Sequence, residues 1–135
     1  MTRRLGLATV TAAAAILSTV GTPAAAAVTD RTPPTAPYLL YSSGLRWTGG
    51  CLPLTVGIQR STDNATPRPA LVYEVFADGI RLGSLSDPGT GAAVWGTLHF
   101  TRPGAQAVTV KAVDAAGNRS VPSNANTVIP YGCPA

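Results

Sequence analysis

The sequence predicts an all-β protein, a seven-stranded antiparallel β-sandwich. Three observations support this fold class. Hydrophobic and polar residues alternate over short runs, turn-forming Gly, Pro, Asn and Asp separate those runs, and no helical period follows the N-terminal segment. Short strands with frequent turns are typical of two packed sheets.

The chain enters the predicted sandwich through an extended lead-in at residues 28–37. Pro33, Pro34 and Pro37 cannot continue a helix and provide no amide donor to a sheet. A short first strand is expected at residues 38–41. Three glycines then predict a loop at residues 42–50, which contains Trp47.

Clear alternation predicts the central strands at residues 54–59, 71–77 and 107–114. Since successive side chains of a strand point to opposite faces, every second residue faces the core. The residues expected to face inward are Leu54, Val56, Ile58, Leu71, Tyr73, Val75, Val108, Val110 and Ala112.

Turn chemistry separates the remaining strands, expected at residues 80–85, 92–100 and 127–131. Asp78-Gly79 predicts a tight hairpin, because the favoured two-residue turn needs positive φ at both positions. Further turns or loops are expected at residues 61–67, 87–91, 102–104 and 114–118.

The N-terminus is interpreted as a signal peptide at residues 1–27. Two arginines precede an apolar run at residues 5–20, and Ala25 and Ala27 fit the small-residue cleavage pattern. We therefore expect a secreted, extracellular protein without a membrane anchor after cleavage. Two of the ten basic residues belong to the signal peptide, which leaves eight against six acidic ones. The remaining basic residues are scattered, so nucleic-acid binding is not expected.

Four segments in order carry a family resemblance: Asp30–Pro37, Ile58–Asn64, Tyr73–Gly79 and Val110–Asn118. Together they resemble bacterial fibronectin type III domains, which are immunoglobulin-like sandwiches, and the resemblance covers roughly residues 30–128. It implies a single domain at 38–135. Two positions depart from the family: Ile58 replaces a usual buried Trp, and Gln106 replaces a common corner Tyr. Trp47 and Trp95 are candidates to refill the core.

The two cysteines, Cys51 and Cys133, predict one disulfide in an exported chain. Cys51 precedes the second strand and Cys133 follows the seventh, and strand parity puts both at one end of the sandwich. The alternatives are two free thiols or an intermolecular link.

Acidic and amide residues suggest a weak calcium candidate. Asp30, Asp63, Asp114 and Asn118 lie in segments that strand parity brings to the same end, and hard cations need several oxygens. The alternative is that these side chains cap turns by bonding to nearby backbone.

No catalytic pattern is recognised, so we expect a non-enzyme without cofactors. His99 is the single histidine and Glu74 the single glutamate, and neither has an expected catalytic partner. Weak ligand-binding candidates are Trp47, Trp95 and Tyr131, with Tyr38 and Tyr41 as further aromatics; the alternative is packing under loops.

The leading interpretation is a secreted binding or spacer module. Association with carbohydrate or the cell wall is implied by the resemblance, because such bacterial domains accompany polysaccharide-degrading enzymes. A protein-interaction or purely structural domain is the alternative. A remote alternative is an accessory protein of a glycosidase system that degrades polysaccharide. We expect exposed, coplanar tryptophans if the ligand is sugar, and buried ones otherwise.

Overall fold

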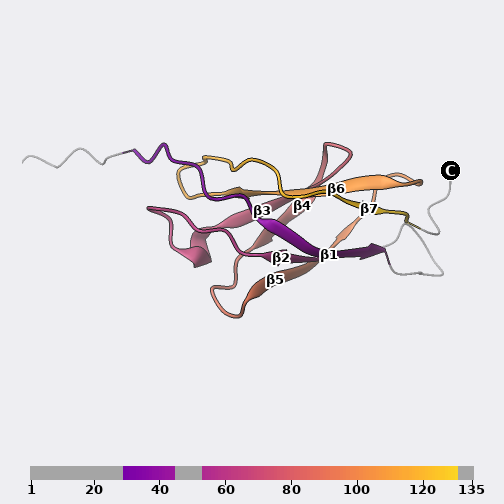
Figure 1. Cartoon of the computed structure of the whole chain (residues 1–135), viewed down its shortest axis with the longest axis horizontal. Coiled ribbons are helices and arrows are strands. Elements are labelled where there is room, and N and C mark those ends of the chain that lie inside the picture. The colour runs from indigo at the N-terminus through magenta and orange to yellow at the C-terminus, as the bar shows by residue number, and fades with distance from the viewer. Residues whose placement is uncertain (1–28, 45–52, 131–135) are drawn as a thin grey trace, which may run out of the picture.

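Two antiparallel sheets pack face to face in the computed structural model, which describes residues 29–44 and 53–130 (Figure 1). One sheet has the order β1-β2-β5 and the other β4-β3-β6-β7. The strands are β1 (Tyr38–Gly44), β2 (Pro53–Gln59), β3 (Val72–Ala77), β4 (Ile80–Ser86), β5 (Ala93–His99), β6 (Gln106–Val113) and β7 (Asn126–Val128). The predicted seven-stranded β-sandwich is therefore confirmed.

The described part of the chain contains one helical segment, the 3₁₀ turn η1 (Arg68–Ala70), which the sequence did not predict. The amide of Leu71 donates to the Arg68 carbonyl and closes this turn, so β3 begins at residue 72 rather than 71. Within the described residues no helix is long and apolar enough to cross a membrane.

The inward-facing residues were predicted correctly. All nine have essentially no exposed surface. Eight of them, all except Leu71, belong to one core cluster with Leu39, Val94 and Phe100. Two glycines allow β4 of one sheet and β5 of the other to pack closely. The Leu85 side chain fills the space over Gly96, where an added Cβ would lie 2.3 Å from a Leu85 methyl carbon, and Leu98 does the same over Gly83 at 2.7 Å.

Strand lengths differ from the prediction at both sheet edges. β1 continues to Gly44 instead of ending at Tyr41, because its pairing with β2 resumes beyond an irregularity between Leu39 and Tyr41. β7 begins one residue early and ends at Val128. Before β7, Ser120 and Ser123 use their hydroxyls to accept hydrogen bonds from β6 amides, so side chains replace part of a regular ladder.

The hairpin between β3 and β4 has the predicted turn. Asp78 and Gly79 have φ of 47° and 78°, the positive values that this turn requires. Asp78 is tied to the neighbouring strand as well, since its carboxylate accepts a hydrogen bond from the amide of Ala107 at 2.8 Å.

The two positions that depart from the fibronectin type III pattern are both buried. Ile58 is fully buried in the core. Gln106, at the start of β6, donates from Nε2 to the Arg102 carbonyl at 2.6 Å. This bond joins the start of β6 to the backbone four residues upstream. The suggestion that Trp95 refills the core is wrong, because its side chain lies outside the sandwich.

Candidate functional site

An aromatic row crosses the outer face of the three-stranded sheet. Tyr41 of β1, Gly57 of β2 and Trp95 of β5 are direct partners in the strand pairing. Val56 and Val94, which precede Gly57 and Trp95, point into the core, so alternation directs Gly57 and Trp95 to the outer face. Tyr41 lies beside Gly57 on that face. Trp95 is 61% exposed and Tyr41 44%, and Tyr38 on the same face is 54% exposed.

Gly57 provides the seat for the indole of Trp95. A Cβ built on Gly57 would lie 2.6 Å from two carbons of the ring, which is closer than real contacts allow. The Trp95 ring therefore lies across the backbone of Gly57. Covering a strand glycine in this way is a known stabilising role for an aromatic residue, but here the larger part of the side chain remains in water.

Uncharged polar residues surround the aromatic row. Ser43, Thr55 and Thr97 form the neighbouring row on one side, and Tyr38, Gln59 and Ala93 form the row on the other. The Tyr41 hydroxyl donates to Ser43 Oγ at 2.7 Å. We name these nine positions, the three rows together, the aromatic face. None of them is charged, and they offer exposed rings beside hydroxyl and amide groups.

The structure shows which of the candidate aromatic side chains in the described residues are exposed to solvent. Tyr38, Tyr41 and Trp95 are exposed rather than packed under loops. Trp47 and Tyr131, the other candidates, lie outside the described residues, so the comparison of two tryptophans stays open. The Tyr41 and Trp95 rings are 6.1 Å apart between centroids and inclined at 49°, so this pair is not coplanar.

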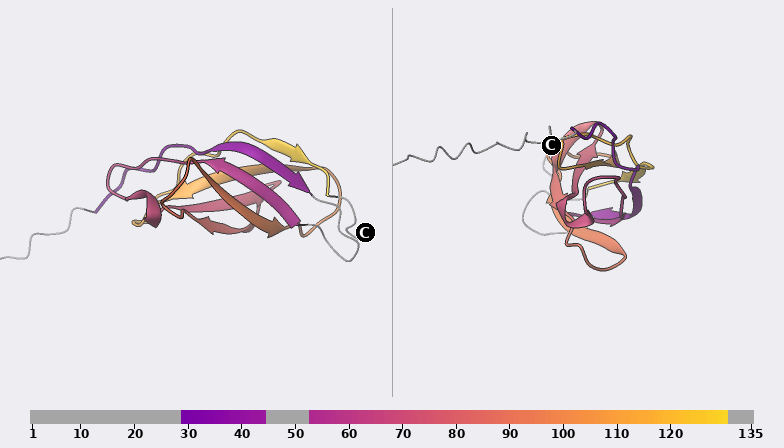
Figure 2. Two further views of the ribbon diagram at one scale, coloured as in Figure 1. Left: turned by 90° about the horizontal axis from the view of Figure 1, so that it is seen from below. Right: turned by 90° about the vertical axis from the view of Figure 1, so that its left-hand side faces the viewer.

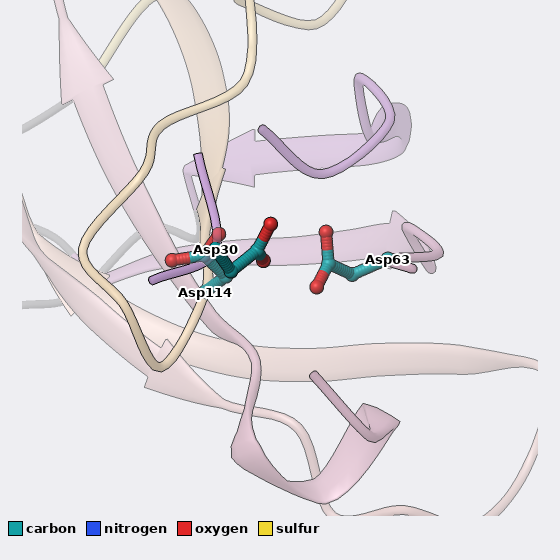
Figure 3. A group of neighbouring side chains, drawn as sticks. All are labelled: Asp30, Asp63 and Asp114. Atoms are coloured by element: carbon teal, nitrogen blue, oxygen red, sulfur yellow. The ribbon is translucent and has the colours of Figure 1, made fainter. Parts of the chain in front are cut away.

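A second candidate site is a cluster of three aspartates at the end of the sandwich where the lead-in reaches the sheets (Figure 3). Asp30 belongs to the lead-in, Asp63 to the β2–β3 loop and Asp114 to the β6–β7 connection. One carboxylate oxygen of each lies within 4.8 Å of the others. The expected convergence of these segments is therefore confirmed.

Hydrogen bonds occupy most of the carboxylate oxygens in this cluster. Asp63 Oδ2 accepts from the amide of Thr66 at 2.7 Å, and Asp114 accepts from both the backbone and the side-chain amide of Asn118 at 2.7 Å each. These are the turn-capping bonds that the sequence offered as the alternative to calcium. Two oxygens, Asp30 Oδ2 and Asp63 Oδ1, are buried and have no hydrogen-bond partner among the described residues.

The backbone around Asp63 stabilises the ionised form of its carboxyl group. The Thr66 amide that donates to Asp63 holds the pKa of that carboxyl below its usual value of 3.8. None of the three aspartates forms a salt bridge within residues 29–44 and 53–130. Asn118 donates its side-chain amide to the Asp30 carbonyl at 3.1 Å and so joins the lead-in to the cluster.

The outer face of the four-stranded sheet has a charged cluster that the sequence did not indicate. Glu74 accepts from Arg119 Nε at 3.0 Å and lies 3.2 Å from Arg81 Nε. Lys111 is its direct partner on β6 and places its ammonium 5.6 Å from the centroid of the Phe76 ring. The hydrogen bond from Arg119 keeps the pKa of Glu74 below its usual value of 4.5.

A buried ion pair closes the sandwich near the aspartate cluster. Arg60 Nη2 lies 3.0 Å from Asp87 Oδ1, and the two side chains are 5% and 0% exposed. Asp87 also accepts from the hydroxyl of Tyr73 at 3.3 Å, and burial raises the pKa of that phenol above its usual value of 10. Arg60 donates to the carbonyls of Thr90 and Gly91. This network joins β2 and β3 to the β4–β5 turn and has a structural role.

The other residues singled out in the sequence are His99 and the two cysteines. His99 is exposed at the end of β5, as expected for a surface side chain. Cys51 and Cys133 lie outside the described residues, so their disulfide stays a prediction. The adjoining described strand ends are compatible with it, since the start of β2 and the end of β7 lie toward the same end of the sandwich (Figures 1 and 2).

Comparison with known proteins assigns no relative. No family model matches the chain, and no curated protein matches its sequence.

Proposed function

We propose that this protein is a secreted, non-catalytic binding module that recognises carbohydrate through its aromatic face. The observation behind the proposal is the pair of exposed rings, Trp95 and Tyr41, on a sheet surface with hydroxyl and amide groups beside them. The faces of sugar rings carry C–H groups that pack on aromatic rings, and their hydroxyls need hydrogen-bond partners. The aromatic face offers both kinds of contact.

The strand order supports the resemblance to fibronectin type III domains. In constant-type immunoglobulin domains the fourth strand extends the sheet of the first two strands. Here the fourth strand, β4, pairs with β3 in the other sheet. The signal peptide predicted from the sequence at residues 1–27 supports an extracellular site of action, where polysaccharide and cell-wall polymers are found.

The test is retention of the secreted protein on a panel of insoluble polysaccharides, with tryptophan fluorescence of the same sample. We expect retention on at least one polymer and a fluorescence change upon binding. Trp95→Ala should abolish both, whereas Val121→Ala removes an apolar side chain that is 70% exposed outside the aromatic face and should change neither. If the unmodified protein is retained on no polymer, a protein partner or a structural role would be favoured.

We also propose calcium binding at the aspartate cluster, as a second function. It is supported by two buried oxygens, Asp30 Oδ2 and Asp63 Oδ1, for which residues 29–44 and 53–130 provide no hydrogen-bond partner and which turn capping leaves unexplained. Calcium prefers carboxylate and carbonyl oxygens, and extracellular modules bind it with dissociation constants of about 10⁻⁴–10⁻³ M.

Calcium at millimolar concentration should raise the melting temperature, because a ligand that binds only the folded state stabilises it. Asp63→Asn keeps the shape of the side chain, removes its charge and should abolish the shift. Asp78→Asn, at the β3–β4 hairpin, is the matched control and should keep it. An unchanged melting temperature in the unmodified protein would refute the calcium site.

A further inference from the structure

We infer that the aromatic face takes a neutral, non-crystalline polysaccharide chain, and not the flat surface of a crystalline polymer. The inference rests on the proposed carbohydrate-binding function and names its substrate class. It depends on two observations, the inclination of the two exposed rings and the absence of charge from the three rows of the aromatic face.

The inclination of the rings selects against a flat ligand. The Tyr41 and Trp95 rings are 6.1 Å apart and inclined at 49°. Sugar rings in a crystal surface lie in nearly one plane, so only one of two rings inclined by this angle can stack on such a surface. A single chain that twists along its length can present one sugar to each aromatic ring.

The inclination is built into the backbone. Trp95 is seated on Gly57, and the irregularity in β1 brings Tyr41 rather than Leu40 opposite Gly57. The hydrogen bond from the Tyr41 hydroxyl to Ser43 then restrains its ring. Neighbouring strands of a sheet are themselves rotated by about 20–25°, so rings on β1 and β5, two strands apart, start from inclined backbones.

The composition of the aromatic face selects against a charged ligand. The row on one side of the rings consists of Ser43, Thr55 and Thr97, and Gln59 lies in the row on the other side. Such groups donate and accept hydrogen bonds without charge, as the hydroxyls of a neutral sugar do. An acidic polysaccharide would need arginine or lysine among these positions.

The experiment compares retention of the secreted protein on crystalline and amorphous preparations of the same neutral polymers. A soluble form of each polymer and an acidic polysaccharide are added, at low and high salt. We expect retention on amorphous or soluble neutral polymer, weak retention on the crystalline form, and little change with salt. Trp95→Ala should lower the affinity at least about tenfold, as central aromatic contacts do, and Val121→Ala should not.

Each other outcome is informative. Equal or stronger retention on the crystalline form would overturn the inference and leave the proposed function standing, as would salt-sensitive binding to the acidic polymer alone. Absence of binding to every polymer would overturn both. Gly57→Ala supplies an independent check, because its Cβ displaces the Trp95 ring. A loss of affinity in a variant with unchanged near-ultraviolet circular dichroism would support the seat, and unchanged affinity would refute it.

Discussion

The two outer faces of this sandwich have opposite chemistry on the same type of scaffold. The face of β1, β2 and β5 exposes Trp95 and Tyr41 and has no charge in its central rows. The face of β3, β4 and β6 gathers Glu74 with three basic side chains around it. The exposed rings are the basis of the proposed ligand contact, whereas the charges on the other face are paired with one another. We therefore expect substitutions on the first face to change ligand affinity and substitutions on the second to change stability.

The largest expected effect comes from Trp95→Ala. It should lower affinity for the polysaccharide at least about tenfold and change the free energy of unfolding by less, because the side chain is 61% exposed. Affinity by depletion and stability by urea unfolding measure the two quantities. A stability loss of several kcal/mol with unchanged affinity would reverse the assignment of this face.

Glu74→Ala is the matching change on the charged face. It should lower the free energy of unfolding by about 1 kcal/mol, since it removes two ion pairs and leaves Arg81, Lys111 and Arg119 without their shared anion. Affinity for polysaccharide should be unchanged. Urea unfolding and the retention assay check the prediction, and lost retention would place the ligand on this face instead.

Acid should act on the charged face and spare the aromatic one. The pKa of Glu74 is lower in the folded protein than its usual value of 4.5, so its stabilising effect is present above pH 4.5 and lost as pH falls through the folded pKa. The free energy of unfolding should therefore decrease below pH 4.5. In Glu74→Gln the decrease should be smaller. The part that remains should come from Asp63, whose pKa is also lowered in the folded protein. Equal slopes for both proteins would contradict the prediction.

The smallest effect is expected for Arg81→Ala. The Arg81 side chain is 52% exposed, and exposed ion pairs contribute about 0–1 kcal/mol. The remaining donor, Arg119, keeps the carboxylate paired. Stability should fall by a few tenths of a kcal/mol at most, as measured by urea unfolding, and high salt should remove the difference. A loss larger than that of Glu74→Ala would mean that Arg81 has a packing role.

The strands and the core were accessible to sequence reasoning because they depend on local pattern. Alternation correctly identified the buried residues of β2, β3 and β6, and Asp78-Gly79 identified the turn between β3 and β4. Strand parity also placed Asp30, Asp63 and Asp114 at one end, since antiparallel strands return the chain to the same end at every second connection. These features need only the order of strands and their period of two.

The features of the candidate site depend on register, which local pattern does not specify. In the strand of Trp95, Val94, Leu98 and Phe100 fall at alternate positions and the large hydrophobic Trp95 falls between them, so local pattern gives both faces of this strand a large hydrophobic residue. Only the pairing of Trp95 with Gly57, 38 positions earlier in the chain, and of Gly57 with Tyr41, assembles the row. The irregularity in β1 that completes it has no sequence signal that we recognised.

The sequence by itself therefore determined the all-β class, the buried faces of the clearest strands, the hairpin turn and the meeting of three aspartates. The tertiary structure decided the surroundings of individual side chains: Trp95 faces water, Gln106 is buried and donates to the Arg102 carbonyl, and Glu74 gathers three cations. The physical reason is that alternation fixes side-chain direction within one strand. The neighbours across strands follow from register, to which every strand of the sheet contributes.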